Sequence, residues 1–119
     1  MNRILIVEDD EDMVELLRIV FRDSGYDVTF SSKALDVDDI IVLRVELIVL
    51  DVRLKGSSKS GADLCKELKS NPDTKEIPII LASGEYNLAE IAKECNADLF
   101  LAKPYDMISL LLTIDRFLF

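Results

Sequence analysis

The chain has 119 residues, a net charge of −9 and no histidine, and half of its residues are apolar. This length and composition are typical of one globular domain with one hydrophobic core. The acidic charge and the scattered basic residues argue against direct binding of nucleic acid, which needs clustered Lys and Arg. The lack of histidine excludes nucleophiles activated by histidine, and with them most zinc and non-haem iron sites.

The apolar runs are short, and none approaches the roughly 20 residues of a membrane-spanning helix. The amino-terminal residues lead directly into a predicted strand rather than into a signal peptide. We therefore expect a cytoplasmic protein with no membrane partner. Cys65 and Cys95 fall on predicted helices without CxxC spacing, so we expect two reduced core thiols rather than a disulfide or a zinc site.

Five apolar runs alternate with helical patterns along the chain, and these predict five strands and five helices. The expected strands lie at about 3–7, 27–30, 47–51, 79–82 and 99–102. The expected helices lie at about 13–23, 35–43, 62–69, 88–94 and 107–118. Strict alternation with right-handed crossovers predicts one α/β domain over residues 1–119, a doubly wound parallel sheet with helices on both faces.

Several helix ends carry recognisable signals. Asp12 and Glu15 have the spacing of a capping box for the first helix, and Gly25 follows its end. Pro72 stops the third helix, and Asp106 is a plausible N-cap for the fifth.

Three groups of polar residues lie at the ends of predicted strands: the acidic run Glu8-Asp9-Asp10, Asp51 and the pair Lys103-Pro104. In an open parallel sheet the carboxyl ends of the strands meet at one edge, so these groups should converge. Packed carboxylates repel one another unless a cation lies among them, and Mg²⁺ prefers such hard oxygen ligands. The pattern therefore predicts a divalent-metal site beside a reactive aspartate, with a lysine ready for an anion.

Together these motifs resemble the receiver domain of two-component response regulators. The matching segments are Ile-Val-Glu8-Asp9, Ile-Val-Leu-Asp51, Leu-Ala-Ser83-Gly84 and Lys103-Pro104, in the family's order and near its spacing. The resemblance covers essentially the whole chain. It implies a flavodoxin-like fold with strand order 2-1-3-4-5 and a phospho-accepting signalling switch rather than a metabolic enzyme.

By this resemblance, Asp51 accepts a phosphoryl group from the phosphohistidine of a sensor histidine kinase or a phosphotransfer protein. An aspartate can act in this way because its carboxylate attacks phosphorus to form an acyl phosphate. The resemblance implies Mg²⁺ or Mn²⁺ bound by Asp9, Asp51 and the backbone carbonyl of Arg53, with Glu8 acting through water. No organic cofactor is implied. Asp10 is one position too far along, and we interpret it as a solvated charge at the start of the first helix.

The resemblance also assigns the groups that meet the phosphoryl oxygens. Lys103 would pair with these oxygens as a point charge, held inward by a cis bond to Pro104. Ser83 would hydrogen-bond the phosphoryl group and move toward it, while Gly84 leaves room for its approach. Phe100 holds the position of an aromatic switch residue on the fifth strand, although a static core or rim residue is an equal alternative.

The chain departs from the family pattern around this site. The loop after Asp51 has Lys55 where a proline is usual, and Gly61 lies later than the family's glycine, so we expect a longer, more polar and mobile loop. The segment from Ser83 to Lys103 is shorter than usual, which predicts a fourth helix that is short or begins irregularly. Arg53 and Glu85 flank the predicted phosphorylation site, and we hypothesise that they form an ion pair across its mouth and slow water attack.

Output is expected on the face formed by the fourth helix, fifth strand and fifth helix. The fifth helix is apolar on most sides, which predicts a homodimer or a partner surface there, and the downstream reader is either another protein or an output domain outside this sequence.

The main alternative is a degenerate receiver that acts as a phosphorylation-independent interaction module. A haloacid-dehalogenase-like enzyme would need an acid at Arg53, and a flavodoxin would need a phosphate-binding first loop in place of residues 8–12.

Overall fold

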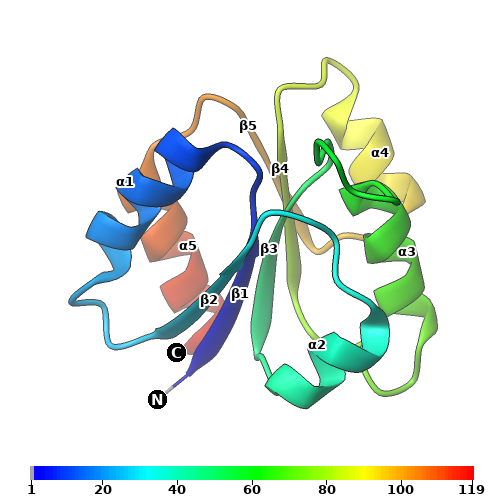
Figure 1. Cartoon of the computed structure of the whole chain (residues 1–119), viewed down its shortest axis with the longest axis horizontal. Coiled ribbons are helices and arrows are strands. Elements are labelled where there is room, and N and C mark those ends of the chain that lie inside the picture. The colour runs from blue at the N-terminus through cyan, green and yellow to red at the C-terminus, as the bar shows by residue number, and fades with distance from the viewer. Residues whose placement is uncertain (1) are drawn as a thin grey trace.

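A five-stranded parallel sheet runs through the centre of the molecule, with helices on both sides (Figure 1). The computed structural model describes residues 2–119. The strands are β1 (Arg3–Val7), β2 (Asp27–Ser31), β3 (Leu47–Asp51), β4 (Ile79–Ser83) and β5 (Leu99–Ala102). The helices are α1 (Glu11–Phe21), α2 (Val37–Leu43), α3 (Gly61–Ser70), α4 (Leu88–Glu94) and α5 (Met107–Leu118). The strand order is β2-β1-β3-β4-β5, which confirms the predicted fold class.

The sheet separates two hydrophobic cores. Helices α1 and α5 cover one face, and α2, α3 and α4 cover the other (Figure 1). Successive residues of a strand point to opposite faces, so Ile4 and Ile6 enter the α1–α5 core while Leu5 and Val7 enter the other. Strands β1, β3 and β4 are buried on both faces, which explains why they appear in the sequence as continuous apolar runs.

The starts of α1, α2 and α3 differ from the predicted ones by one or two residues. Helix α1 begins at Glu11, and its N-cap is Asp10, whose carboxylate accepts hydrogen bonds from the amides of Asp12 and Met13. The predicted capping box at Asp12 and Glu15 is therefore wrong, because Asp10 already satisfies these first free N–H groups. Asp10 is exposed, as expected of a solvated charge.

Helix α3 has a capping box that was not predicted. The Ser60 hydroxyl accepts from the amide of Asp63, and the Asp63 carboxylate accepts from the amide of Ser60. Asp106 caps α5 as predicted, accepting from the amide of Ile108 at 2.9 Å. The short fourth helix is confirmed as α4.

The loop from β3 to α3 is attached to its surroundings by several hydrogen bonds. The Ser57 hydroxyl accepts from the amide of Ala34 at 3.1 Å, and the amide of Gly61 donates to the carbonyl of Val52 at 2.8 Å. A Cβ atom at Gly61 would lie 1.8 Å from the Asp51 carbonyl oxygen, so only glycine fits there. The loop's mobility stays a prediction, but its end is fixed against the end of β3.

None of the helices between residues 2 and 119 combines the length and the apolar composition that a membrane span requires. Cys65 and Cys95 are buried free thiols, with the Cys65 sulfur 3.4 Å from the carbonyl oxygen of Cys95. Burial, reinforced by the contact with Cys95, raises the pKa of the Cys65 thiol. Both cysteines thus lie in the core with free thiols, and their reduced state stays a prediction.

Candidate functional site

Five polar side chains from four strand ends meet at the carboxyl edge of the sheet. Glu8 and Asp9 follow β1, Asp51 ends β3, Ser83 ends β4 and Lys103 follows β5. All five line one cavity of about 630 Å³. The sheet topology brings them together because parallel strands end on the same side, as the sequence analysis expects.

Lys103 joins two of the carboxylates. Its Nζ lies 2.5 Å from Glu8 Oε1 and 2.8 Å from Asp51 Oδ2. Burial alone would lower the pKa of Lys103, but the hydrogen bonds to Asp51 and Glu8 outweigh burial and raise the pKa. The lysine is therefore a fixed cation beside Asp51.

Glu8 is the most buried of the acids, with 4% of its surface exposed. Burial raises the pKa of Glu8, while the hydrogen bonds from Lys103 and the amide of Asp10 oppose that rise. The repulsion from Asp51 acts in the same direction as burial. A further positive charge at this place would stabilise the ionised form of both acids.

The acidic residues have the geometry of a cation site. Glu8, Asp9 and Asp51 each offer one carboxylate oxygen, and these oxygens lie within 4.8 Å of one another. Carboxylate oxygens are hard ligands of the type that Mg²⁺ and Mn²⁺ prefer. The donor set therefore fits a divalent metal, while Asp10 lies outside it as the cap of α1.

The carboxylates of Asp9 and Asp51 also hold the backbone of the β3–α3 loop. Asp9 Oδ2 accepts from the amide of Lys55 at 2.8 Å, and Asp51 Oδ1 accepts from the amide of Arg53 at 3.2 Å. The bond to Lys55 was missed by the sequence analysis. No motif signals it, because it depends on where a loop distant in sequence folds back.

Ser83 and Gly84 also line the cavity. Ser83 is buried, and its hydroxyl accepts from the amide of Glu85 at 3.2 Å. A Cβ at Gly84 would meet nothing within 4 Å, so this side of the cavity is open. The peptide bond between Lys103 and Pro104 is cis, as the resemblance predicts.

The hypothesised ion pair across the mouth of the site is confirmed. The Arg53 guanidinium contacts the Glu85 carboxylate, and both residues line the cavity. The Arg53 side chain is largely exposed, whereas that of Glu85 is mostly covered. This pair joins the β3–α3 loop to the segment after β4.

Two aromatic residues lie close to Lys103 in the sequence. Phe100 on β5 has 44% of its surface exposed, so it lies at the protein surface rather than in the core. Tyr105, which the sequence analysis did not single out, is half-buried, and burial together with the negative charge of Glu8 raises its pKa to about 12. Its position directly after Lys103-Pro104 was the available signal.

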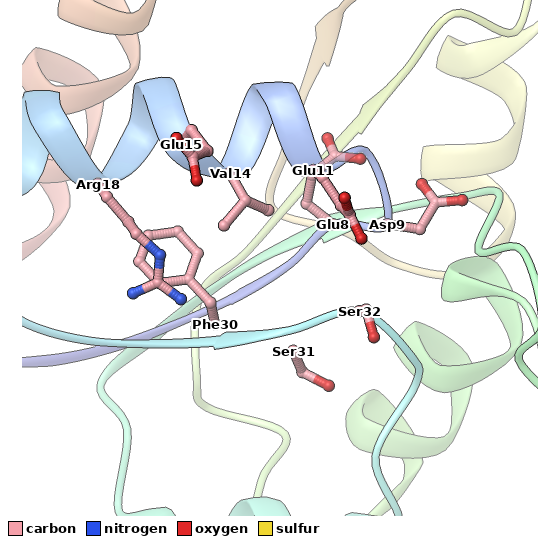
Figure 2. A pocket seen from close by; sticks show the side chains of 9 residues that line it. All are labelled: Glu8, Asp9, Glu11, Val14, Glu15, Arg18, Phe30, Ser31 and Ser32. Atoms are coloured by element: carbon pink, nitrogen blue, oxygen red, sulfur yellow. The ribbon is translucent and has the colours of Figure 1, made fainter.

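A groove of about 280 Å³ between α1 and β2 extends away from Glu8 and Asp9 (Figure 2). Figure 2 shows the Arg18 side chain lying against the Phe30 ring. The Arg18 guanidinium carbon is 4.5 Å from the centre of that ring. Glu11 and Glu15 on α1 make the rim acidic. The groove shares its inner end with the candidate site.

Comparisons with known proteins agree with this geometry. The sequence pattern of the "Response regulator receiver domain" family matches residues 4–115. The chain is 32% identical over 109 residues to the DNA-binding response regulator MtrA of Mycolicibacterium smegmatis, covering 87% of this chain but 45% of MtrA. It is 29% identical over 118 residues to sporulation initiation phosphotransferase F of Bacillus subtilis, covering 98% and 94%.

A solved structure is similar over nearly the whole chain. The receiver domain of a signal transduction histidine kinase from Syntrophus aciditrophicus superimposes with a TM-score of 0.86 at 30% identity, covering 99% of this chain and 90% of that one. The parallel sheet of order β2-β1-β3-β4-β5 and the family match together identify the chain as a member of the response regulator receiver domain family.

Proposed function

We propose that this chain is a phospho-accepting switch in which Asp51 takes a phosphoryl group from the phosphohistidine of a sensor kinase or phosphotransfer protein. The observation that carries the proposal is the placement of Asp51. Its carboxylate is buried at the floor of an open cavity, 2.8 Å from the Lys103 ammonium and beside the oxygens of Glu8 and Asp9.

Asp9, Asp51 and the backbone carbonyl of Arg53 would hold Mg²⁺ or Mn²⁺ directly, with Glu8 acting through water. The metal would supply positive charge for the phosphoryl oxygens. Phosphoryl transfer depends mainly on positioning and charge neutralisation, so little further covalent machinery is required. A buried pair of acids beside a single lysine supports this assignment, because the acids outnumber the fixed cation.

Asp51 would attack phosphorus with one of its carboxylate oxygens, and the bond from phosphorus to the histidine nitrogen of the partner would break. The Lys103 ammonium would then move toward the phosphoryl group, since a phosphate brings about two negative charges and three acceptor oxygens. Ser83 would donate its hydroxyl hydrogen to one of these oxygens. The new hydrogen bond donated by Ser83 and the movement of Lys103 are the local changes from which a switch could start. Phe100 is a candidate to move in response.

The partners follow from this role. A sensor histidine kinase or phosphotransfer protein supplies the phosphoryl group, and a downstream protein or an output domain reads the face made by α4, β5 and α5. The relative from Bacillus subtilis carries "phosphotransferase" in its name, which supports a place in a phosphorelay. MtrA is named as DNA-binding, but this chain spans less than half of its length.

Titration with Mg²⁺ followed by beryllofluoride, read by NMR, tests the proposal. Wild type should respond to both, because beryllofluoride mimics a phosphoryl group on a carboxylate. Asp51→Asn should lose the beryllofluoride response. Asp23→Asn is the matched control, since Asp23 is an exposed aspartate remote from the cavity, and it should respond as wild type does.

A folded wild type with no response to beryllofluoride would contradict the proposal. That result would favour the second candidate, a receiver fold that acts only as a protein-interaction module.

A further inference from the structure

The hydrogen bond between Asp9 and Lys55 links two parts of the chain, and the fold itself does not require this link. Asp9 lies in the turn between β1 and α1, and Lys55 lies in the loop between β3 and α3. The amide nitrogen of Lys55 is 2.8 Å from Asp9 Oδ2. This length is typical of a charge-assisted hydrogen bond to a carboxylate.

The bond fixes the orientation of the Asp9 carboxylate. Among residues 2–119 the Lys55 amide is the one hydrogen-bond donor to this carboxylate. A carboxylate has two oxygens, so the bond to Oδ2 leaves Oδ1 free. Asp9 is only half-buried, and without this donor its side chain could rotate into solvent.

Lys55 belongs to the same site through its position as well as through this bond. It lines the cavity that contains Glu8, Asp51 and Lys103. The loop that carries Lys55 is also fixed to the β2–α2 connection, where the amide of Ala34 donates to the Ser57 hydroxyl. A change at Asp9 can therefore be transmitted to a surface loop.

We propose that the backbone amide of Lys55 positions the Asp9 carboxylate for a divalent cation and so couples the β3–α3 loop to occupancy of the metal site. This inference rests on the proposed function, because it assumes that Asp9 is a metal ligand. Lys55 is a positioning residue, and it acts through its amide rather than through its ammonium group. Outer hydrogen-bond partners of metal ligands commonly tune metal affinity in this way.

The local backbone offers a clean way to remove the donor. The amide of Ser57 donates to the carbonyl of Leu54 at 3.2 Å, and Gly56 between them has a φ of 73°. These features are typical of a type II turn with Lys55 at its second position, where proline is favoured. Lys55→Pro therefore deletes the N–H and keeps the turn, whereas Lys55→Ala deletes only the side chain.

The test compares Mn²⁺ and Mg²⁺ affinity of Lys55→Pro with that of Lys55→Ala, because both variants lack the ammonium group. We expect Lys55→Pro to bind the metal roughly tenfold more weakly than Lys55→Ala. Equal affinities would overturn the inference and leave the proposed metal site intact. Tighter binding by Lys55→Pro would also overturn it, since the amide would then compete with the metal.

Amide hydrogen exchange in wild type tests the inference even if Lys55→Pro does not fold. Coupling is reciprocal, so Mg²⁺ should slow exchange of the Lys55 amide by a factor similar to the loss of affinity in Lys55→Pro. In Asp9→Ala, exchange of this amide should be faster than in wild type and unaffected by Mg²⁺. An exchange rate in wild type that Mg²⁺ does not change would overturn the inference. A wild type that binds no metal and ignores beryllofluoride would overturn both this inference and the proposed function.

Discussion

The two ends of the central sheet are built from different chemistry. At the carboxyl ends of the strands, Glu8, Asp51 and Ser83 are buried polar residues around a shared cavity. At the amino ends, side chains contact one another instead of lining a cavity of this kind. The Tyr26 hydroxyl donates to the Asp115 carboxylate, and the centre of the Tyr26 ring lies 6.2 Å from that of the Phe119 ring.

This difference separates function from stability within one scaffold. The amino end pairs its polar groups with each other, as where Asp98 accepts from the amide of Ile79 at 2.8 Å and lies 2.7 Å from Lys69 Nζ. The carboxyl end has two buried acids for one lysine, so it is prepared for an added cation. Changes at the amino end should therefore cost stability alone, whereas changes at the carboxyl end should alter binding.

The largest effect is expected at Gly61. This residue is an exception to the separation of stability from function, because its substitution should affect both. A Cβ at this position would lie 1.8 Å from the Asp51 carbonyl oxygen, and a backbone atom cannot move away cheaply. Gly61→Ala should lower the free energy of unfolding by about 3 kcal/mol or more in urea denaturation, and it should impair the Asp51 site as well. Gly84→Ala is the control: its Cβ would meet nothing within 4 Å, so we expect a change of about 0.5 kcal/mol or less. Equal costs in the two variants would contradict this packing argument.

Metal binding should stabilise the carboxyl end. At a Mg²⁺ concentration 100 times the dissociation constant, the free energy of unfolding of wild type should rise by about 2.7 kcal/mol. Asp51→Asn should lose most of this gain, because it removes one of the three clustered carboxylates. Thermal unfolding with and without Mg²⁺ measures the effect, and an equal gain in Asp51→Asn would place the metal elsewhere.

Tyr26→Phe probes the amino end. It deletes the hydroxyl that donates to Asp115, and we expect a loss of about 1 kcal/mol in the free energy of unfolding. The gain from Mg²⁺ and the response to beryllofluoride should both be unchanged, since the carboxyl end is untouched. Tyr86→Phe is the matched control, because Tyr86 is 98% exposed and should lose nothing measurable. A weakened beryllofluoride response in Tyr26→Phe would show that the two ends are coupled.

The smallest expected effect concerns the ion pair of Arg53 and Glu85. Alanine at either position should shorten the lifetime of the phosphorylated state by roughly two- to fivefold, the factor that corresponds to about 0.4–1 kcal/mol for an exposed pair. The free energy of unfolding should stay nearly constant, because the Arg53 side of the pair is largely exposed even though Glu85 is mostly covered. Loss of labelled phosphate over time measures the lifetime, and an unchanged lifetime in both variants would refute a role in excluding water.

Secondary structure was predictable where burial imposed a clear pattern. The doubly buried strand β3 and the apolar helix α5 lie within the predicted residues. Helix starts were less predictable, since Asp10, Asp12 and Glu15 all resemble capping residues. Which of them caps α1 depends on the direction in which the chain leaves β1, and the sheet sets that direction.

The candidate site was predictable because its residues end strands that must be parallel. Glu8, Asp51 and Lys103 all lie at the carboxyl edge for that reason, and the strand order places β3 beside β1 and one strand away from β5, so that their side chains meet. The roles of Ser83 and Phe100 as switch residues stay predictions, since they concern a second state of the molecule.

The sequence by itself determined the order of strands and helices, the two-faced core and the set of acids and lysine at one edge of the sheet. Periodicity and strand-end position encode these features locally, so no contact between distant segments has to be known. Only the tertiary structure decided three contacts. The Asp9 carboxylate accepts a hydrogen bond from the Lys55 amide, Gly61 packs against the Asp51 carbonyl, and the Tyr26 hydroxyl donates to the Asp115 carboxylate. Each of these contacts joins segments far apart in the chain through loop geometry, which no local pattern of residue types specifies.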